Sequence, residues 1–79
     1  MTEYVIKLKD SLVFVNRIVA QDNAVNIETG KRDEKALVFT SLPVAVHMCD
    51  VLNAGMRFSS YTVALRDTKL GNWHYTQLD

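Results

Sequence analysis

Seventy-nine residues form at most one domain, and 48% apolar with 23% charged residues is ordinary for a folded globular protein. Nine Lys and Arg residues balance nine Asp and Glu residues, so the net charge favours neither nucleic acid nor an anionic membrane as a partner. The first ten residues lack the apolar run of a signal peptide and one cysteine allows no internal disulfide, so we expect a single cytoplasmic domain, residues 1–79, with no membrane association.

The first part of the chain predicts three strands. Tyr4, Ile6 and Leu8 alternate mostly with charged neighbours, which is the period-two pattern of a half-buried strand. Residues 12–20 are rich in β-branched side chains and predict a second strand. Asn23 tolerates the left-handed backbone of a hairpin turn, and a third strand should follow over residues 24–28.

A polar loop and a short extended run come next. Residues 29–34 contain a glycine and four charged side chains, which indicates a surface loop. Residues 35–40 predict a short fourth strand that brings Phe39 close to the start of a helix.

Residues 42–54 predict that helix. Ser41 is a favourable N-cap because its hydroxyl can accept a hydrogen bond from an amide of the first turn. Pro43 falls in the first turn, where its missing N–H costs nothing. Gly55 stands where a left-handed C-terminal residue belongs.

Two further strands close the chain. Tyr61, Val63 and Leu65 recur with period two, residues 67–72 contain a turn around Gly71, and residues 73–78 predict the last strand. The order ββββαββ favours an α+β fold, in which an antiparallel sheet of five or six strands carries the helix across one face.

Apolar side chains cover more of this helix than one sheet can bury. At 100° per residue one arc should face the sheet; it contains Leu42, Ala45, Cys49, Leu52 and Met56. The roughly opposite arc contains Val44, His47 and Val51, with Met48 at its edge. Either a loop or the terminal hairpin covers this second arc, or it binds a partner, which would be a second copy or another protein.

No arrangement of side chains indicates catalysis. His47 and Cys49 project to different sides of a helix, so they form a poor nucleophilic pair, and Cys49 should be a buried, unreactive core residue. One cysteine with two separated histidines cannot supply the ligands of a zinc site. We therefore expect a non-enzymatic protein without a metal or another cofactor.

Nucleic-acid binding is the alternative function. Lys31, Arg32 and Lys35 form a local basic cluster, although acidic residues interrupt it and a solvated loop explains it as well. Trp73 and Tyr75 share one face of the last strand, where aromatic rings can stack on bases. Such rings are more often part of the core under the helix.

Short motifs over about half of the chain carry a resemblance. YVIK at residues 4–7 precedes a polar hairpin, and KALVFTS at residues 35–41 precedes a helix that ends in Asn-Ala-Gly. In these features the chain resembles small accessory proteins of bacteriophages and prophages, a group that includes anti-CRISPR inhibitors of host defence. The resemblance implies an inhibitor or modulator of a host protein complex and no catalytic residues. SLPVAV departs from the pattern, because a Glu-Ala pair is usual after the serine.

Overall fold

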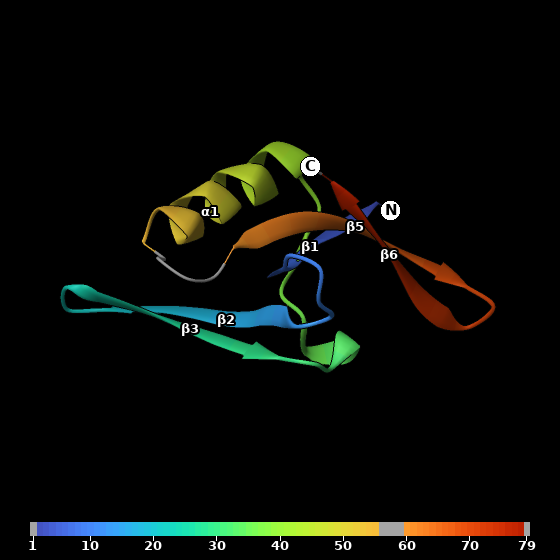
Figure 1. Ribbon diagram of the computed structural model, residues 1–79, viewed down its shortest axis with the longest axis horizontal. Helices are drawn as coiled ribbons and strands as arrows, with labels where there is room; N and C mark the ends of the chain where they lie inside the picture. The colour runs from blue at the N-terminus through green and yellow to red at the C-terminus, as the bar shows by residue number, and fades with distance from the viewer. Residues whose placement is uncertain (1, 56–59, 79) are drawn as a thin grey trace.

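The computed structural model describes residues 2–55 and 60–78, in which one helix lies on one face of an antiparallel sheet (Figure 1). The elements are β1 (Glu3–Leu8), β2 (Phe14–Gln21), β3 (Ala24–Gly30), the 3-10 helix η1 (Asp33–Lys35), β4 (Val38–Phe39), α1 (Leu42–Ala54), β5 (Tyr61–Lys69) and β6 (Asn72–Leu78). The predicted α+β class and the order ββββαββ are confirmed.

The central strand of the sheet is β1. The strand order is β3-β2-β1-β5-β6, and β1 pairs with β5 along its whole length. Its other edge is shared, because β4 pairs with its first half and β2 with its second half. The neighbours Val5 and Ile6 point to opposite faces and are both fully buried. The sheet therefore has a core on each face.

The core on the first face lies under α1, which packs mainly across β5 and β1. The helix contributes Ala45, Cys49 and Leu52, as the helical wheel predicts, and the sheet contributes Ile6, Val15, Tyr61 and Val63. The other two residues of the predicted sheet-facing arc differ. Leu42 is partly exposed at the start of the helix, and Met56 lies outside the described residues.

A bulge in β2 decides which of its side chains reach this core. The register with β3 shifts after Val15, so Val15 and Ile18 both contact the core although they are three residues apart. Asn16 is the bulged residue. Oriented to satisfy both of its groups, its amide donates to the Lys35 carbonyl (3.1 Å) and accepts from the Gly30 N–H (3.2 Å). A Cβ at Gly30 would lie 2.7 Å from this amide, so a side chain at position 30 would displace the Asn16 amide from its two hydrogen bonds.

The helix has the predicted bounds, but its ends are held differently. The Ser41 carbonyl accepts from the Ala45 N–H at 3.0 Å, whereas the Ser41 hydroxyl makes no capping bond. Gly55 has a φ of −93°, so its predicted left-handed conformation was wrong. Asn53 holds this end instead, because its side-chain amide donates to the Tyr61 carbonyl (3.0 Å) and accepts from the Tyr61 N–H (2.7 Å).

Several predicted boundaries also move. The left-handed residue of the β2–β3 turn is Asp22 (φ 56°), which tolerates this conformation as asparagine does, and not Asn23. Cross-strand pairing extends β3 to Gly30 and β5 to Lys69, so the last turn is confined to residues 70–71. The fourth strand shrinks to two residues, because Lys35 belongs to η1 and only Val38 and Phe39 pair with β1.

The core on the second face is built by curling the sheet. Val5, Phe14, Ala36 and Ala64 are buried there, and Tyr75 packs against them. The ring centroids of Phe14 on β2 and Tyr75 on β6 lie 4.8 Å apart, although β1 and β5 separate these strands in the sheet. The interpretation of Tyr75 as part of the core under the helix was therefore wrong. Leu78 is the β6 residue that packs on the helix side.

Because Cys49 is buried, we expect its thiol to react slowly in the native protein. Burial raises the pKa of the Cys49 thiol, the nearby charge of Asp50 raises it further, and the hydrogen bond from Asn53 offsets part of the rise. Because the thiolate is the reactive form, a disulfide reagent at pH about 8 should label the native protein at least roughly tenfold more slowly than the unfolded chain. Equal labelling rates with and without denaturant would contradict the burial.

Candidate functional site

The outer side of α1 carries exposed apolar residues. Val44 and Val51 are each 53% exposed, and His47 is exposed beside them. Met48 is half-buried because it packs against the core under the helix. Nothing within residues 2–55 and 60–78 covers the two valines to the extent that a core residue is covered, so the interpretation that a loop or terminal hairpin hides this arc loses its support.

One of the two valines, Val51, also lines a groove between the end of α1 and the β2–β3 hairpin. The groove encloses about 160 Å³ and is lined by Val25, Ile27, Val51, Leu52 and Gly55. We call this set of residues the apolar groove. It stays open because α1 packs on β5 and β1 rather than on β2 and β3 (Figure 1). Val25 is consequently 59% exposed.

Sequence reasoning missed the hairpin side of this groove. The alternation of Val25 and Ile27 was recognised as a strand pattern, but the same pattern fits a strand that the helix covers. Which strand is left uncovered depends on where the helix lies, and no local pattern encodes that. The partly exposed Val46, on another side of α1, was missed as well.

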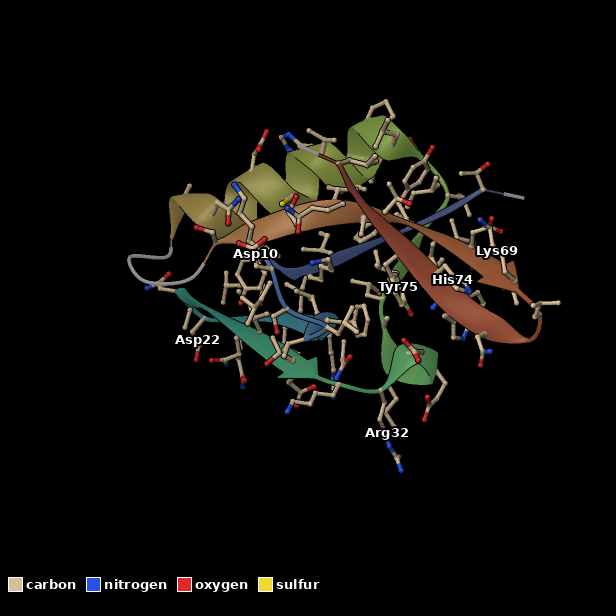
Figure 2. The ribbon with its side chains drawn as sticks, turned by 45° about the vertical axis from the view of Figure 1, so that its right-hand side comes forward. Asp10, Asp22, Arg32, Lys69, His74 and Tyr75 are labelled. Atoms are coloured by element: carbon tan, nitrogen blue, oxygen red, sulfur yellow. The ribbon has the colours of Figure 1, made fainter. Side chains whose placement is uncertain are left out.

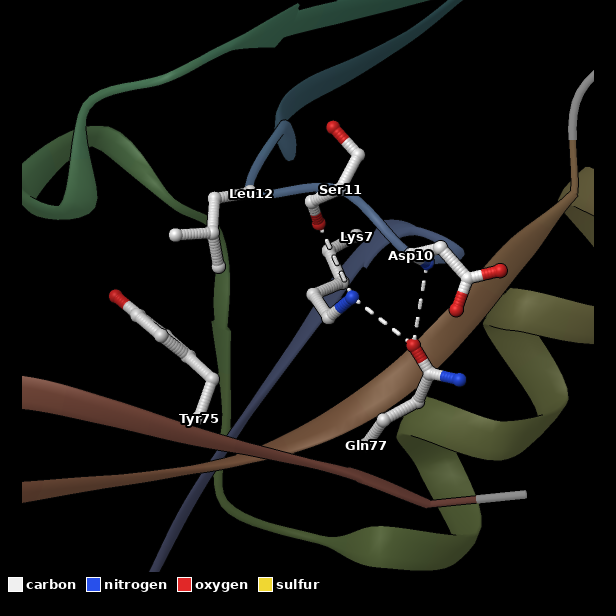
Figure 3. A pocket seen from close by; sticks show the side chains of 6 residues that line it. All are labelled: Lys7, Asp10, Ser11, Leu12, Tyr75 and Gln77. Carbon is white, nitrogen blue, oxygen red and sulfur yellow. Dashed lines mark hydrogen bonds between the residues drawn. The ribbon is translucent and has the colours of Figure 1, made fainter.

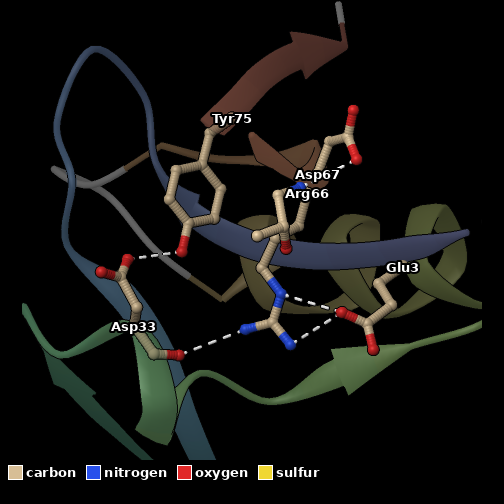
Figure 4. Close-up of polar contacts among 6 residues, drawn as sticks. Glu3, Asp33, Arg66, Asp67 and Tyr75 are labelled. Carbon is tan, nitrogen blue, oxygen red and sulfur yellow. Dashed lines mark hydrogen bonds and ion pairs between the residues drawn. The ribbon is translucent and has the colours of Figure 1, made fainter. Parts of the chain in front are cut away.

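On the other face of the sheet, Arg66 organises a polar network. Its side chain is only 8% exposed. Its Nε and Nη2 donate to Glu3 Oε1 at 3.1 and 2.9 Å, and its Nη1 donates to the Asp33 carbonyl at 3.2 Å (Figure 4). The guanidinium also lies 4.1 Å from the centre of the Trp73 ring, a cation–π contact. Arg66 thus ties β1, η1 and β6 to β5.

Tyr75 adds a second link to η1. Its hydroxyl donates a hydrogen bond to the Asp33 carboxylate (Figure 4). Burial raises the pKa of the Tyr75 phenol well above its ordinary value, and both the hydrogen bond to Asp33 and the negative charge of Asp33 raise it further. A phenol held in this way is a stable donor and a poor acid, so its role is structural.

A shallow pocket of about 340 Å³ opens between the β1–β2 turn and β6. It is lined by Lys7, Asp10, Ser11, Leu12, Tyr75 and Gln77 (Figure 3). The buried Lys7 Nζ donates to the carbonyls of Leu8 (3.1 Å) and Ser11 (3.0 Å) and to Gln77 Oε1 (3.0 Å). These three acceptors match the three ammonium hydrogens. Lys7 therefore fastens the turn to β6 and has no hydrogen left for a substrate.

The predicted nucleic-acid residues lie near one another but are partly engaged within the chain. Lys31, Arg32 and Lys35 are exposed around η1, and Asp33 between them bonds to β6 through Tyr75. Arg32 lies 3.7 Å from the Glu34 carboxylate. The Tyr75 ring packs on Phe14, and Arg66 occupies one face of Trp73. Aromatic stacking on bases would have to displace these contacts or use the remaining face of Trp73.

Other kinds of site find little support. Among the described residues, no three His, Cys, Asp or Glu side chains cluster as metal ligands do. The longest described helix, α1, has 13 residues and is too short to cross a bilayer. No protein-family model, curated protein or solved structure matches the chain. The resemblance to phage accessory proteins therefore stays a prediction.

Replacing Tyr75 by Phe tests the network. The variant keeps the ring on Phe14 but loses the bond to Asp33, so its free energy of unfolding should fall by about 1–2 kcal/mol at neutral pH. A tyrosine whose pKa is raised by folding stabilises the protein below about pH 10 and loses this contribution as the pH rises further. The free energy of unfolding, measured by urea titration, should therefore fall less between about pH 9 and about pH 11 for Tyr75→Phe than for the unmodified protein. Equal losses would contradict this role of the phenol.

Proposed function

We propose that the protein is a small, non-enzymatic protein-binding module, and that the apolar groove with the adjoining Val44 and His47 is its binding surface. The observation that carries this proposal is the exposure of three valines, each more than half exposed: Val25, Val44 and Val51. Val25 and Val51 line the groove, and Val44 lies about two helical turns before Val51 on the same side of α1. Valine is a weaker helix former than lysine or glutamate, so the two helical valines are costly on a face that meets only water. A partner that covers them explains their presence.

The size of the groove indicates the kind of partner. Pockets for drug-sized molecules usually enclose about 300–1,000 Å³, whereas this groove encloses about 160 Å³. One or two apolar side chains fill such a space. A helix of another protein, which inserts side chains spaced three or four residues apart, fits it better than a small ligand does.

From the sequence resemblance we propose a host protein complex as the partner, with a defence system as the leading candidate, and the cytoplasm as the location. A chain of this size can inhibit a larger machine by occlusion alone. A standard interface takes about 800 Å² from each partner, a substantial part of the 5614 Å² that this chain exposes.

A homodimer that forms through the helix would cover less of the same surface than another protein would. Helix-to-helix pairing would cover Val44, His47 and Val51, but it would leave Val25 on the far side of the groove exposed. A single partner element that lies in the groove contacts both sides. We therefore favour another protein over a second copy at this site.

Nucleic-acid binding through Lys31, Arg32 and Lys35 is the second candidate, and a salt titration separates the two. Phosphate contacts made by several cationic side chains weaken steeply between about 50 and 200 mM salt, in proportion to the number of contacts. Binding through the apolar groove should change little over this range.

Changing Val51 to Lys tests the binding surface. Because Val51 is half exposed and lies outside the core, the free energy of unfolding should change by less than about 0.5 kcal/mol. A photo-reactive amino acid at position 51 would identify the partner in host cells by crosslinking and mass spectrometry. Val51→Lys should then weaken binding of that partner at least roughly tenfold, because it places a charge in an apolar contact.

Leu70→Lys is the matched control. Leu70 is fully exposed at the tip of the β5–β6 hairpin, away from the groove, so binding should be unaffected. If Val51→Lys unfolds the protein, the arc belongs to the fold. If the variant folds and binds as the unmodified protein does, the helix is not part of the interface.

A further inference from the structure

The outer edge of β3 is open. β3 is the last strand in the sheet order, and in the part of the chain that the structure describes no strand pairs with its side away from β2. Alternate residues of such an edge direct their N–H and C=O groups outward, and proteins usually protect them with lysine, proline or a bulge. The sequence of β3, AVNIETG, contains neither lysine nor proline and has one charged residue, Glu28, near its end, and the bulge of this hairpin lies on β2.

β3 and β6, the two ends of the order β3-β2-β1-β5-β6, differ in their central side chains. On the helix side β6 presents the polar residues His74 and Thr76, whereas β3 presents Val25 and Ile27. An additional strand beside β3 would cover the exposed Val25 as well as bond to the open backbone.

We propose that this additional strand is β3 of a second copy of the chain, antiparallel to the first about a two-fold axis at Asn26. The two sheets then join into one continuous sheet. This proposal is carried by the edge strand. It shares Val25 and Ile27 with the apolar groove but does not need the function proposed for that groove, because Val51 stays outside the strand pairing.

Side-chain pairing selects Asn26 as the centre. In an antiparallel pair, opposite residues lie on the same face, so a symmetric pair centres on one residue. Centring on Glu28 would oppose two carboxylates, and centring on Val25 would oppose Glu28 to Asp22. Centring on Ile27 would place Val25 opposite a threonine. Only the centre at Asn26, among residues 25–28, pairs Val25 with Ile27 of the second copy in both halves.

Charges at the ends of β3 support the same register. With Asn26 at the centre, Asp22 lies opposite Gly30 of the second copy and next to its Lys31. Within one chain Asp22 lies at one end of β3, and Lys31 directly follows the other end, where Figure 2 labels the neighbouring Arg32. Nine residues of strand span roughly 30 Å, several times the Debye length of about 8 Å at physiological salt. An interaction between Asp22 and Lys31 therefore requires two copies.

The joined sheet would also enlarge the apolar groove. A two-fold axis perpendicular to the sheet keeps both copies of α1 on the same face. The two grooves would open toward each other, across a floor made of Val25 and Ile27 from both copies. Val51 would stay exposed at each side.

The primary test is Asn26→Lys, measured by sedimentation equilibrium. Asn26 is exposed, so the fold of each copy should be unaffected, but the variant opposes two ammonium groups at the axis. We expect the unmodified protein to be a dimer and the dissociation constant to rise at least roughly tenfold in the variant. Asn72→Lys, the same change on the edge strand β6, should leave the dimer intact.

A charge cycle checks the register independently. Lys31→Glu places a second carboxylate near Asp22 of the other copy and should weaken the dimer roughly fivefold, since the contact occurs twice. In an Asp22→Asn background, which keeps a residue suited to the left-handed turn, Lys31→Glu should have little effect. Equal effects in both backgrounds would overturn this register.

Three results would overturn the proposal as a whole. One is a protein that stays monomeric up to about 1 mM, where specific pairing is negligible. Another is a dimer that Asn26→Lys leaves unchanged. The third is a dimer that Asn26→Lys strengthens, because a centre at Ile27 would bring the new lysine to Glu28. Val51→Lys should not alter the dimer, so failure of this proposal is distinguishable from failure of the proposed function.

Discussion

The fold depends on covering β1 on both faces. Val5 and Ile6 are neighbours, point in opposite directions and are both fully buried, so the sheet cannot leave either face to water. The chain has one α-helix among its described residues, and it covers the Ile6 side. The Val5 side is covered by curling the sheet until Phe14 meets Tyr75. Because α1 lies over the middle of the sheet, no helix covers β3 among the described residues. The apolar groove between α1 and β3 is the result.

Two buried cations hold the curled face in shape. Lys7 bonds to neutral acceptors in the β1–β2 turn and on β6, and Arg66 bonds to Glu3 and to the backbone of η1. Burying a charge is costly unless its hydrogen bonds are replaced, and here they are replaced by groups from different elements. Lys7 thereby fastens the β1–β2 turn, and Arg66 fastens η1, which has no buried residues of its own.

The secondary-structure elements could be predicted from the sequence, but the side of the sheet on which several side chains lie could not. The helix bounds, the ββββαββ order and the buried arc with Cys49 follow from periodicity and local signals. Periodicity also placed Val44 and Val51 outside the core. It could not show that Tyr75 belongs to a second core or that Val25 and Ile27 would border a groove, because both depend on the bulge at Asn16 and on the curl of the sheet. The left-handed conformation predicted for Gly55 was wrong for a related reason, which is a contact that the local signal does not encode. The Asn53 side chain holds the end of the helix through its hydrogen bonds with Tyr61.

The pairing of β1 with β5 has a consequence for how the protein is made. Glu3 is paired with Arg66, which lies 63 residues later in the sequence. The central pairing of the sheet, β1 with β5, therefore cannot form until β5 is present. The β2–β3 and β5–β6 hairpins are local and can form early, but neither contains a complete core. Contacts this distant in sequence are slow to form and leave apolar strands unprotected in the meantime. The centre of the sheet can therefore form only after β5 has been synthesised, not progressively from β1.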